Sequence, residues 1–263
     1  MAGVMERTLG ILEILAQEAE GLPLAAIADR LDIPKSAAHR LLSDLMRFGY
    51  VRQAREQGDY LLTTRLTSLG LGFLSASGIV DAAQPLLDRL ATVSGELVRL
   101  SVVDGRSLTW VAKAQGARGG LRYDPDMGAV ARLSCSASGL AWLSTLNDDE
   151  ALELVVEQGF GRPEDYGHNA PTTALALLKE LARTRTRGFA LAMETFAPGM
   201  HAMAAPVVRA EHPACGVISI AGPGFRLTEE RMLTLGNSLL EVADELAAST
   251  SASGMLRSAR TFR

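Results

Sequence analysis

The 263-residue chain has little cysteine, little net charge and no long apolar run. Its two cysteines, Cys135 and Cys215, cannot form a disulfide framework, and neither lies in a C-x-x-C pair or near a spaced histidine pair. We therefore expect no metal site and no cofactor. No stretch approaches the roughly 18 consecutive apolar residues of a spanning helix, and Glu6 and Glu13 interrupt the apolar N-terminus. We predict a cytoplasmic protein that does not associate with membranes.

Motifs of catalysis are missing as well. No G-x-S-x-G, H-E-x-x-H, P-loop or G-x-G-x-x-G motif stands where a strand would turn into a helix, and the four histidines are scattered. Ser134, Ser136 and Ser138 precede a predicted helix, where a serine caps the helix more often than it acts as a nucleophile. We predict that the chain is not an enzyme.

What the chain does contain is an ordinary folded composition with a local basic region. It is 48% hydrophobic and 21% charged, and its length is that of about two domains. The net charge is −4, yet between Arg30 and Arg55 six cations meet only two anions. Because a nucleic-acid surface is local, a mildly acidic protein can still carry one.

Apolar spacing in the first 65 residues predicts three short helices and a hairpin. Residues 5–17 place Met5, Leu9, Leu12 and Leu15 or Ala16 on one stripe, and residues 24–31 repeat the pattern. Pro34 suits the first position of a third helix, which Gly49 ends. A strand, turn and strand follow up to Leu62. Three helices and a hairpin in this order predict a winged helix-turn-helix domain, whose third helix enters the major groove.

The polar face of the third helix predicts how DNA is read. Short side chains let the backbone approach base edges, and a few donors and acceptors read those edges. The predicted base-reading residues are Ser36, Ala37, His39 and Arg40. Longer cations suit phosphate contacts. The predicted phosphate contacts are Lys35, Arg47, Arg52 and Arg55.

The rest of the chain predicts an α+β domain. Residues 64–94 predict a connecting helix, a break at 75–78 and an entry helix, and a leucine-rich connector favours packing against its twin in a dimer. Alternation of apolar and polar residues predicts five strands, at 97–103, 108–113, 188–195, 199–208 and 216–221. Helical patterns fill residues 137–146, 148–158, 172–185 and 227–248. This order favours a single antiparallel sheet.

The run LPLAAIADRLDIPKSAAHRLLSDLMRFGYV, residues 22–51, resembles the DNA-binding module of the IclR-type transcriptional regulators. That module has the pattern L-T-x-x-E-I-A-x-x-L-G-L-P-K-S-T-x-x-R-L-L and then G-Y-V. Ala26 and Ala37 depart from it, and Ala37 removes a hydroxyl from the reading face. Further blocks of resemblance, such as Val102-Val103-Asp104-Gly105 and residues 218–223, cover nearly the whole chain. The resemblance implies a GAF-like effector-binding domain after the winged helix.

The resemblance also implies where an effector binds. In the family, the pocket is lined by the loop after the third strand and by inward residues of later strands. The loop corresponds to residues 136–139, ahead of a helix whose N–H groups and dipole suit a carboxylate. Members that bind small polar oxoacids carry polar residues where this chain has Ala192, Ala202 and Ala221. The residues predicted to line the pocket are Trp110, Tyr123, Ser136, Ala137, Ser138, Ala192, Met200, Ala202, Ser219 and Ala221, with Met193 as a further candidate.

Apolar walls around a small hydrated acid would leave its polar atoms unpaired. We therefore expect a larger, partly apolar effector, such as an aromatic acid or its amide, hydrazide or ester. The expected protein is a ligand-responsive regulator, a repressor in preference to an activator, that binds double-stranded operator DNA as a homodimer or a dimer of dimers. The alternative left open is a GAF-fold enzyme or redox protein that uses Cys135 or Cys215 and carries an accessory helical domain.

The expected organisation follows from these assignments. The fold class is α+β, with an N-terminal winged helix-turn-helix domain, a connecting helix and a C-terminal GAF-like domain built on an antiparallel sheet. The expected boundaries are 1–64 for the DNA-binding domain, 65–80 for the linker helix, 81–250 for the effector-binding domain and 251–263 for a flexible basic tail.

Overall fold

The computed structural model describes residues 3–55, 58–123, 128–161, 163–209 and 211–249. The predicted tail, residues 251–263, lies outside the described residues. The chain divides into two compact units, Met1–Ala76 and Ser77–Arg263.

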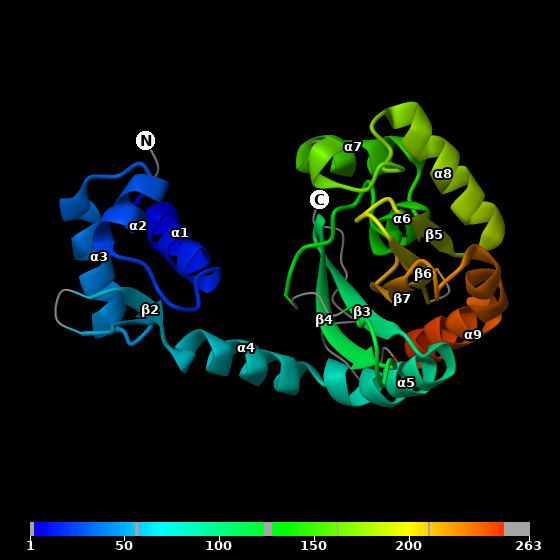
Figure 1. The fold of residues 1–263 in the computed structure, drawn as a ribbon, viewed down its shortest axis with the longest axis horizontal. Helices are drawn as coiled ribbons and strands as arrows, with labels where there is room; N and C mark the ends of the chain where they lie inside the picture. The colour runs from blue at the N-terminus through cyan, green and yellow to red at the C-terminus, as the bar shows by residue number, and fades with distance from the viewer. Residues whose placement is uncertain (1–2, 56–57, 124–127, 162, 210, 250–263) are drawn as a thin grey trace. The chain divides into compact units, whose positions relative to one another are not determined.

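The N-terminal unit consists of helices followed by a small hairpin (Figure 1). Its elements are α1 (Val4–Ala16), α2 (Leu24–Arg30), α3 (Lys35–Arg47), β1 (Val51–Gln53), β2 (Tyr60–Leu62) and α4 (Thr64–Ser77). The two strands pair antiparallel, and Leu22 adds a bridge to Tyr60 on β2. The predicted winged helix-turn-helix fold is confirmed.

The turn between α2 and α3 is fixed by the backbone. Asp32 takes a left-handed conformation, φ 49°, which an aspartate adopts more readily than most residues. The amide of Ile33 then donates to the carbonyl of Ala28 at 3.0 Å. Pro34 is the N-cap of α3, one position before the expected first turn, and its carbonyl accepts from Ala38 at 3.0 Å.

The end of α3 aims the chain into the wing. Gly49 has φ 76°, a conformation that costs glycine little. The amide of Tyr50 donates back to the carbonyl of Leu45 at 2.9 Å, which closes the helix and turns the chain toward β1. The register of the hairpin pairs Val51 with Leu62.

The core of the N-terminal unit lies among α1, α2, α3 and the hairpin. From α1 it receives Ile11 and Leu15, whereas Met5 and Leu9 are 71% and 50% exposed. The expected stripe is therefore confirmed at Leu15 and at Leu12, which packs against the core, and is wrong at Met5 and Leu9. The face of α1 that meets α3 is centred on Ile11 and its i+4 neighbour Leu15, and Met5 lies off that face.

The connecting helix α4 buries none of its residues. Leu69, Leu71 and Phe73 are each at least half exposed. The helix continues through the expected break at residues 75–77 and ends only before Gly78, which has φ 66°. Among the described residues, no single helix is long and apolar enough to span a membrane. The helices on either side of Gly78 reach that measure only when counted together as a broken pair.

The C-terminal unit is built on a five-stranded antiparallel sheet in the order β4-β3-β7-β6-β5. Its strands are β3 (Leu97–Asp104), β4 (Ser107–Gln115), β5 (Ala190–Met193), β6 (Met200–Val207) and β7 (Gly216–Pro223). Its helices are α5 (Ile79–Ser94), α6 (Ala137–Leu143), α7 (Asp148–Gln158), α8 (Ala174–Arg187) and α9 (Glu229–Ala248), with a 3₁₀ turn at Pro163–Asp165. The predicted α+β class and the antiparallel sheet are confirmed.

Helices cover the sheet on both sides. α5 and α9 pack against each other and against the sheet, and α6 packs on β5, β6 and β7 with α8 beside it. Figure 1 shows α5 and α9 together at one side and the group α6, α7 and α8 at the other. The central strand β7 is buried along its whole length, as expected for a strand covered on both faces. A cavity lies where α6 faces the sheet.

Candidate DNA-reading helix and effector cavity

The two faces of α3 differ in burial and chemistry. Ala38, Leu41, Leu42 and Leu45 are buried in the core. On the other side Lys35, Ser36, His39, Arg40 and Arg47 are exposed, and Ala37 is half buried. The apolar residues recur at i, i+3, i+4 and i+7, so the core fixes the rotation of the helix and turns its basic side to the solvent.

The charged side chains of this face are available to a partner. Within the described residues, the side chains of Lys35, His39 and Arg40 have no hydrogen-bond or ion-pair partner. Arg47 lies 3.2 Å from Asp44, but both side chains are more than half exposed, so the pair contributes little and is easily exchanged for a phosphate.

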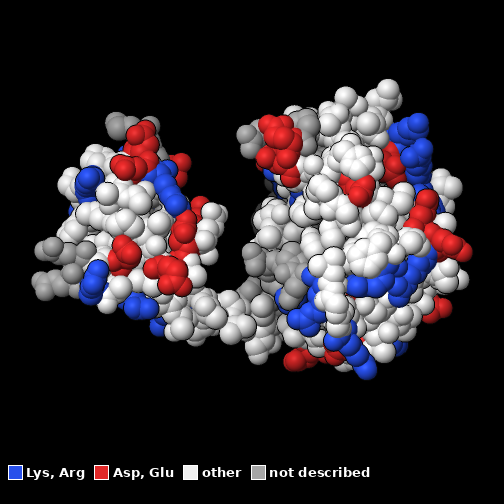
Figure 2. Space-filling model, in the orientation of Figure 1, with Lys and Arg blue, Asp and Glu red and all other residues white. Residues whose placement is uncertain are grey.

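The wing continues this basic surface. Arg52 and Arg55 are both exposed on the hairpin, and the side chain of Gln53 holds the turn by donating to the carbonyl of Gly58 at 2.9 Å. Figure 2 shows Lys and Arg side chains around the wing, whereas α4 has no charged residue after Arg65. All eight residues predicted to contact DNA lie on the third helix or the wing.

A cavity lies in the C-terminal unit between α6 and the sheet. All ten residues predicted to line an effector pocket line this one cavity, from Trp110 on β4 to Ala221 on β7. The cavity also contains three residues that the sequence did not indicate, namely Arg99, Phe196 and His201. Met193 does not reach it. Because Met193 follows Ala192 on the same strand, it points to the opposite face and lines a second hollow beside α8.

The strand register explains the floor of the cavity. Ala192 pairs with Ala202, and Ala202 pairs with Ala221, so three alanines stand side by side across β5, β6 and β7. Two residues along, Ser219 pairs with Arg99 on β3. The floor is therefore a flat apolar row next to a buried cation. The free volume of the cavity is about 30 Å³, which is room for about two water molecules.

Arg99 lines the cavity and lies over Trp110. The residue is 6% exposed, and its guanidinium carbon lies 4.0 Å from the centre of the Trp110 ring and 5.8 Å from that of Tyr123. Phe196 meets Trp110 edge-on, with the ring centres 6.5 Å apart. The guanidinium is thus stacked between aromatic rings, an arrangement stabilised by cation–π attraction.

Two buried donors of this cluster lack an acceptor among the described residues. The Nε atom of Arg99 and the Nε1 atom of Trp110 are buried and have no hydrogen-bond partner among the described residues. Burial lowers the pKa of Arg99, opposed by Tyr123, and burial raises the pKa of Tyr123, opposed by Arg99. Tyr123 is therefore a neutral phenol at pH 7 and gives the arginine no counter-charge.

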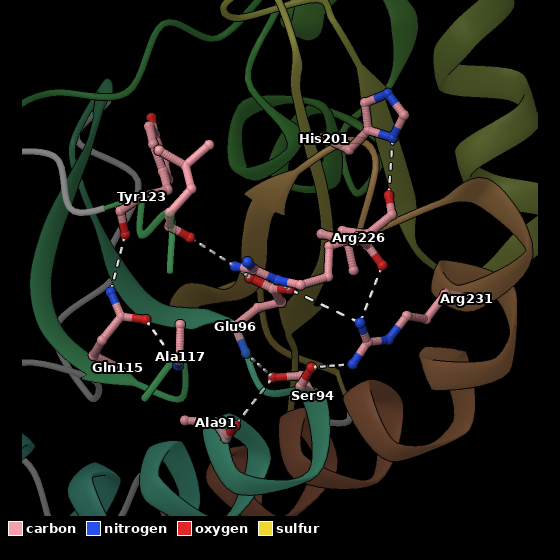
Figure 3. Close-up of polar contacts among 11 residues, drawn as sticks. Ala91, Ser94, Glu96, Gln115, Ala117, Tyr123, His201, Arg226 and Arg231 are labelled. Carbon is pink, nitrogen blue, oxygen red and sulfur yellow. Dashed lines mark hydrogen bonds and ion pairs between the residues drawn. The ribbon is translucent and has the colours of Figure 1, made fainter. Parts of the chain in front are cut away.

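An ion pair between Glu96 and Arg226 connects the segment beside the cavity to the C-terminal end of α5 (Figure 3). Glu96 follows α5, and its side chain is only 2% exposed. Arg226 donates to both of its oxygens, at 2.5 and 2.8 Å, and also to the carbonyl of Leu121 at 3.1 Å. Gln115 donates to the carbonyl of Tyr123 at 3.0 Å, so the segment that carries this ring is held at two points.

Two further contacts belong to the same frame. His201 donates from Nδ1 to the carbonyl of Leu227 at 2.9 Å, one residue after Arg226. Arg231 donates to the carbonyl of Ser94 at 2.7 Å and to that of Arg226 at 3.0 Å. Figure 3 shows these groups converging from the sheet, α5 and α9. The cavity wall and the end of α5 therefore share one hydrogen-bonded network.

The expected carboxylate loop at residues 136–139 is mostly helix. Ser136 is the N-cap of α6, and its hydroxyl accepts from the amide of Gly139 at 3.0 Å, so this serine caps the helix. Ala137 and Ser138 form the first turn and line the cavity. The anion-binding role of this turn stays a prediction. Arg99, which lines the same cavity, is a second candidate for that role.

The cysteines do not form a redox pair of the reactive kind. Both are buried free thiols. Burial raises the pKa of Cys135 to about 12 and that of Cys215 to about 11, whereas a reactive cysteine needs a lowered pKa and access to solvent. The alternative of a redox protein or thiol enzyme is therefore not favoured. The described residues contain no group of three or more metal-ligating side chains that could hold a metal ion.

A winged helix-turn-helix unit joined to an α+β unit with an internal cavity defines a ligand-responsive transcriptional regulator. Two family models match the chain. The one described as "IclR helix-turn-helix domain" matches residues 4–55, and the one described as "Bacterial transcriptional regulator IclR C-terminal" matches residues 72–248. The chain belongs to the IclR family of bacterial transcriptional regulators. As a member of this family it is a regulator and not an enzyme.

Individual relatives agree with this assignment. The HTH-type transcriptional regulator BhcR of Paracoccus denitrificans is 30% identical over 92% of this chain and 85% of its own length. The transcriptional repressor IclR of Escherichia coli is 28% identical over 92% and 88%. Among solved structures, an IclR homologue from Microbacterium hydrocarbonoxydans complexed with 4-hydroxybenzoate superposes with a TM-score of 0.78, at 20% identity over 95% of this chain and all of that one.

Proposed function

We propose that this regulator is a repressor that acts in the cytoplasm and binds a pseudo-palindromic operator through α3 and the wing of each subunit of a homodimer, or of a dimer of dimers. An organic acid or acid derivative bound in the cavity changes its affinity for the operator. The exposed basic face of α3, on which Lys35 and Arg40 have no partner among the described residues, carries the proposal. Two relatives support it, since one is named a repressor and another is complexed with 4-hydroxybenzoate.

The side chains divide between reading and anchoring. Ser36, Ala37, His39 and Arg40 face outward from the first turns of α3, the part of a recognition helix that reaches base edges. The proposed phosphate contacts lie at the ends of that face and on the wing, and they are Lys35, Arg47, Arg52 and Arg55. Base contacts carry sequence information, whereas phosphate contacts set affinity and its salt dependence.

Two matched substitutions test this division. Arg40→Ala should weaken operator binding by about ten- to a hundredfold and leave random duplexes nearly unaffected, since a good base contact contributes about 1–3 kcal/mol. Lys35→Ala should weaken all duplexes and lower the salt slope by about one. Footprinting of upstream DNA and fluorescence anisotropy measure both effects. Equal losses on operator and random DNA for Arg40→Ala would contradict its reading role.

The dimer is supported by apolar surface on α4. Leu69, Leu71 and Phe73 lie on a helix that buries nothing of its own. Leu69 and Phe73 stand at i and i+4 and share one face of the helix, and an exposed apolar face favours association. Phe73→Asp should convert the protein to monomers in analytical ultracentrifugation and reduce operator affinity, whereas Ser68→Asp, at an exposed polar position away from that face, should leave the dimer intact. A stable Phe73→Asp dimer would refute this role of α4.

A further inference from the structure

We propose that Arg99 is the anion-binding residue of the cavity and that the effector is an aromatic monocarboxylate, whose carboxylate pairs with this guanidinium while its ring takes the place on Trp110 that the guanidinium covers. This inference rests on the proposed effector binding in the cavity. It narrows the ligand from acids and their derivatives to the acid itself.

The first step is the unbalanced charge. Arg99 is a cation that is 94% buried, since 6% of it is exposed. Among the described residues no carboxylate pairs with it, and Tyr123, which shares a side-chain hydrogen bond with it, is neutral at pH 7. A buried charge without a counter-charge is unfavourable in a folded protein. A monoanion that enters the cavity removes this imbalance.

The second step is the shape of the donor set. The cavity presents the Nε–H of Arg99 and the Nε1–H of Trp110, both buried and unpaired. Two of the nearby hydroxyls already have acceptors, since Ser219 donates to the carbonyl of Arg99 and Ser136 to that of Arg132. Unpaired donors and a planar guanidinium fit a carboxylate, which accepts through two coplanar oxygens. An amide or an ester has one carbonyl oxygen and no charge.

The third step is the wall. Trp110, Tyr123 and Phe196 contribute three aromatic rings, and the alanines of the three neighbouring strands make a flat floor. The present free space of about 30 Å³ is too small for a benzene ring. The guanidinium already covers the indole, 4.0 Å from the ring centre, so an aromatic acid that stacks on Trp110 displaces it. The same movement frees the guanidinium to turn toward the carboxylate.

The test measures benzoate, benzamide and glyoxylate binding to the full-length protein by calorimetry. Wild type should bind benzoate at least about tenfold more tightly than either of the others, because only benzoate offers both a charge and a ring. Arg99→Met should weaken benzoate binding by at least about thirtyfold and change benzamide binding by less than about threefold. Benzoate binding that is unchanged in Arg99→Met, tighter binding of glyoxylate, or no benzoate binding at millimolar concentration would each overturn the inference.

A matched control and a spectroscopic signal keep the result interpretable. Arg187 lies over the ring of Phe189 at 5.5 Å and outside this cavity, so Arg187→Met should bind benzoate as wild type does. With Trp142→Phe as background, Trp110 is the sole tryptophan, and benzoate should change its emission because the stacked guanidinium leaves. Unchanged Trp110 emission on saturation with benzoate would count against the displacement.

Two further measurements separate this inference from the function beneath it. Asp124 and Asp126 follow Tyr123 in the sequence and lie outside the described residues. Replacing both by Asn should leave benzoate affinity within about threefold, and a gain of more than about tenfold would mean that a carboxylate of the chain already neutralises Arg99, which overturns the inference. Operator binding by Arg99→Met should equal that of wild type. If benzoate fails while the operator is bound, the inference falls and the DNA-binding function stands.

Discussion

The buried ion pair between Glu96 and Arg226 allows a quantitative prediction. In Arg226→Met the side-chain volume is nearly kept, but the carboxylate of Glu96, 2% exposed, loses two charge-assisted hydrogen bonds of 2.5 and 2.8 Å. Removing one member of a buried pair costs about 3–5 kcal/mol. Two features reduce the cost here, because the Arg226 side chain is itself 27% exposed and Arg231 stays at 3.9 Å from the same carboxylate.

We therefore expect Arg226→Met to lower the free energy of unfolding of the C-terminal unit by about 3 kcal/mol, and its Tm by about 6–12 °C for a unit of this size. Urea titration followed by circular dichroism measures the first and calorimetry the second. The double variant Glu96→Gln with Arg226→Met should recover at least half of the loss, because the unpaired charge is then gone.

An exposed pair of the same type provides the control. Arg89 and Glu245 join α5 to α9, but their side chains are 50% and 48% exposed. Exposed pairs contribute about 0–1 kcal/mol, so Arg89→Met should change stability by less than about 1 kcal/mol. If Arg226→Met costs no more than Arg89→Met, burial of Glu96 does not set the strength of this contact and the reasoning is refuted.

Two other predictions concern buried groups. Both thiols should resist iodoacetamide at pH 8 in the native protein and react in urea. Because burial raises the pKa of Cys135 to about 12 and of Cys215 to about 11, only the unfolded thiols ionise between pH 9 and 11, so stability should fall there by about 1.4 kcal/mol per pH unit per thiol relative to the Cys→Ala variants. A Cβ on Gly139 would lie 2.4 Å from the carbonyl oxygen of Leu133, so Gly139→Ala should destabilise by about 1–3 kcal/mol in a urea titration, and an unchanged midpoint would contradict this packing.

Much of the fold could be predicted from local sequence. The core side of α3 follows helical spacing, and Gly49 and Gly78 take the positive φ at which each helix ends. The stripe on α1 could not be assigned correctly, because Met5, Leu9 and Ile11 are all apolar and only the packing partner decides which of them are buried. The same holds for α4, where the sequence predicts an apolar helix but does not say what covers it, and Leu69, Leu71 and Phe73 are exposed in the single chain.

The cavity was predictable only in part. Alternation along β5, β6 and β7 and the family resemblance bring ten residues to it. Arg99 was not predicted to line the cavity because β3 is buried at seven successive positions. The strand therefore has no alternation of polar and apolar residues that would show which face Arg99 lies on. Phe196 was not predicted to line the cavity because Glu194, with φ 53°, ends the strand before it. The one available signal was a lone cation inside an apolar strand.

The same network predicts how the cavity communicates with the DNA-binding unit. Arg226 joins Leu121, close to the ring of Tyr123, to Glu96 at the end of α5. α5 is the helix that follows α4 in the chain, so a ligand that moves the Tyr123 segment acts on the element next to the linker. Arg226→Met should therefore reduce the benzoate-induced change in operator affinity, about five- to a hundredfold for a typical coupling, toward one, while Arg89→Met preserves it. Full coupling in Arg226→Met, at saturating benzoate and below its Tm, would place the path of communication elsewhere in the molecule.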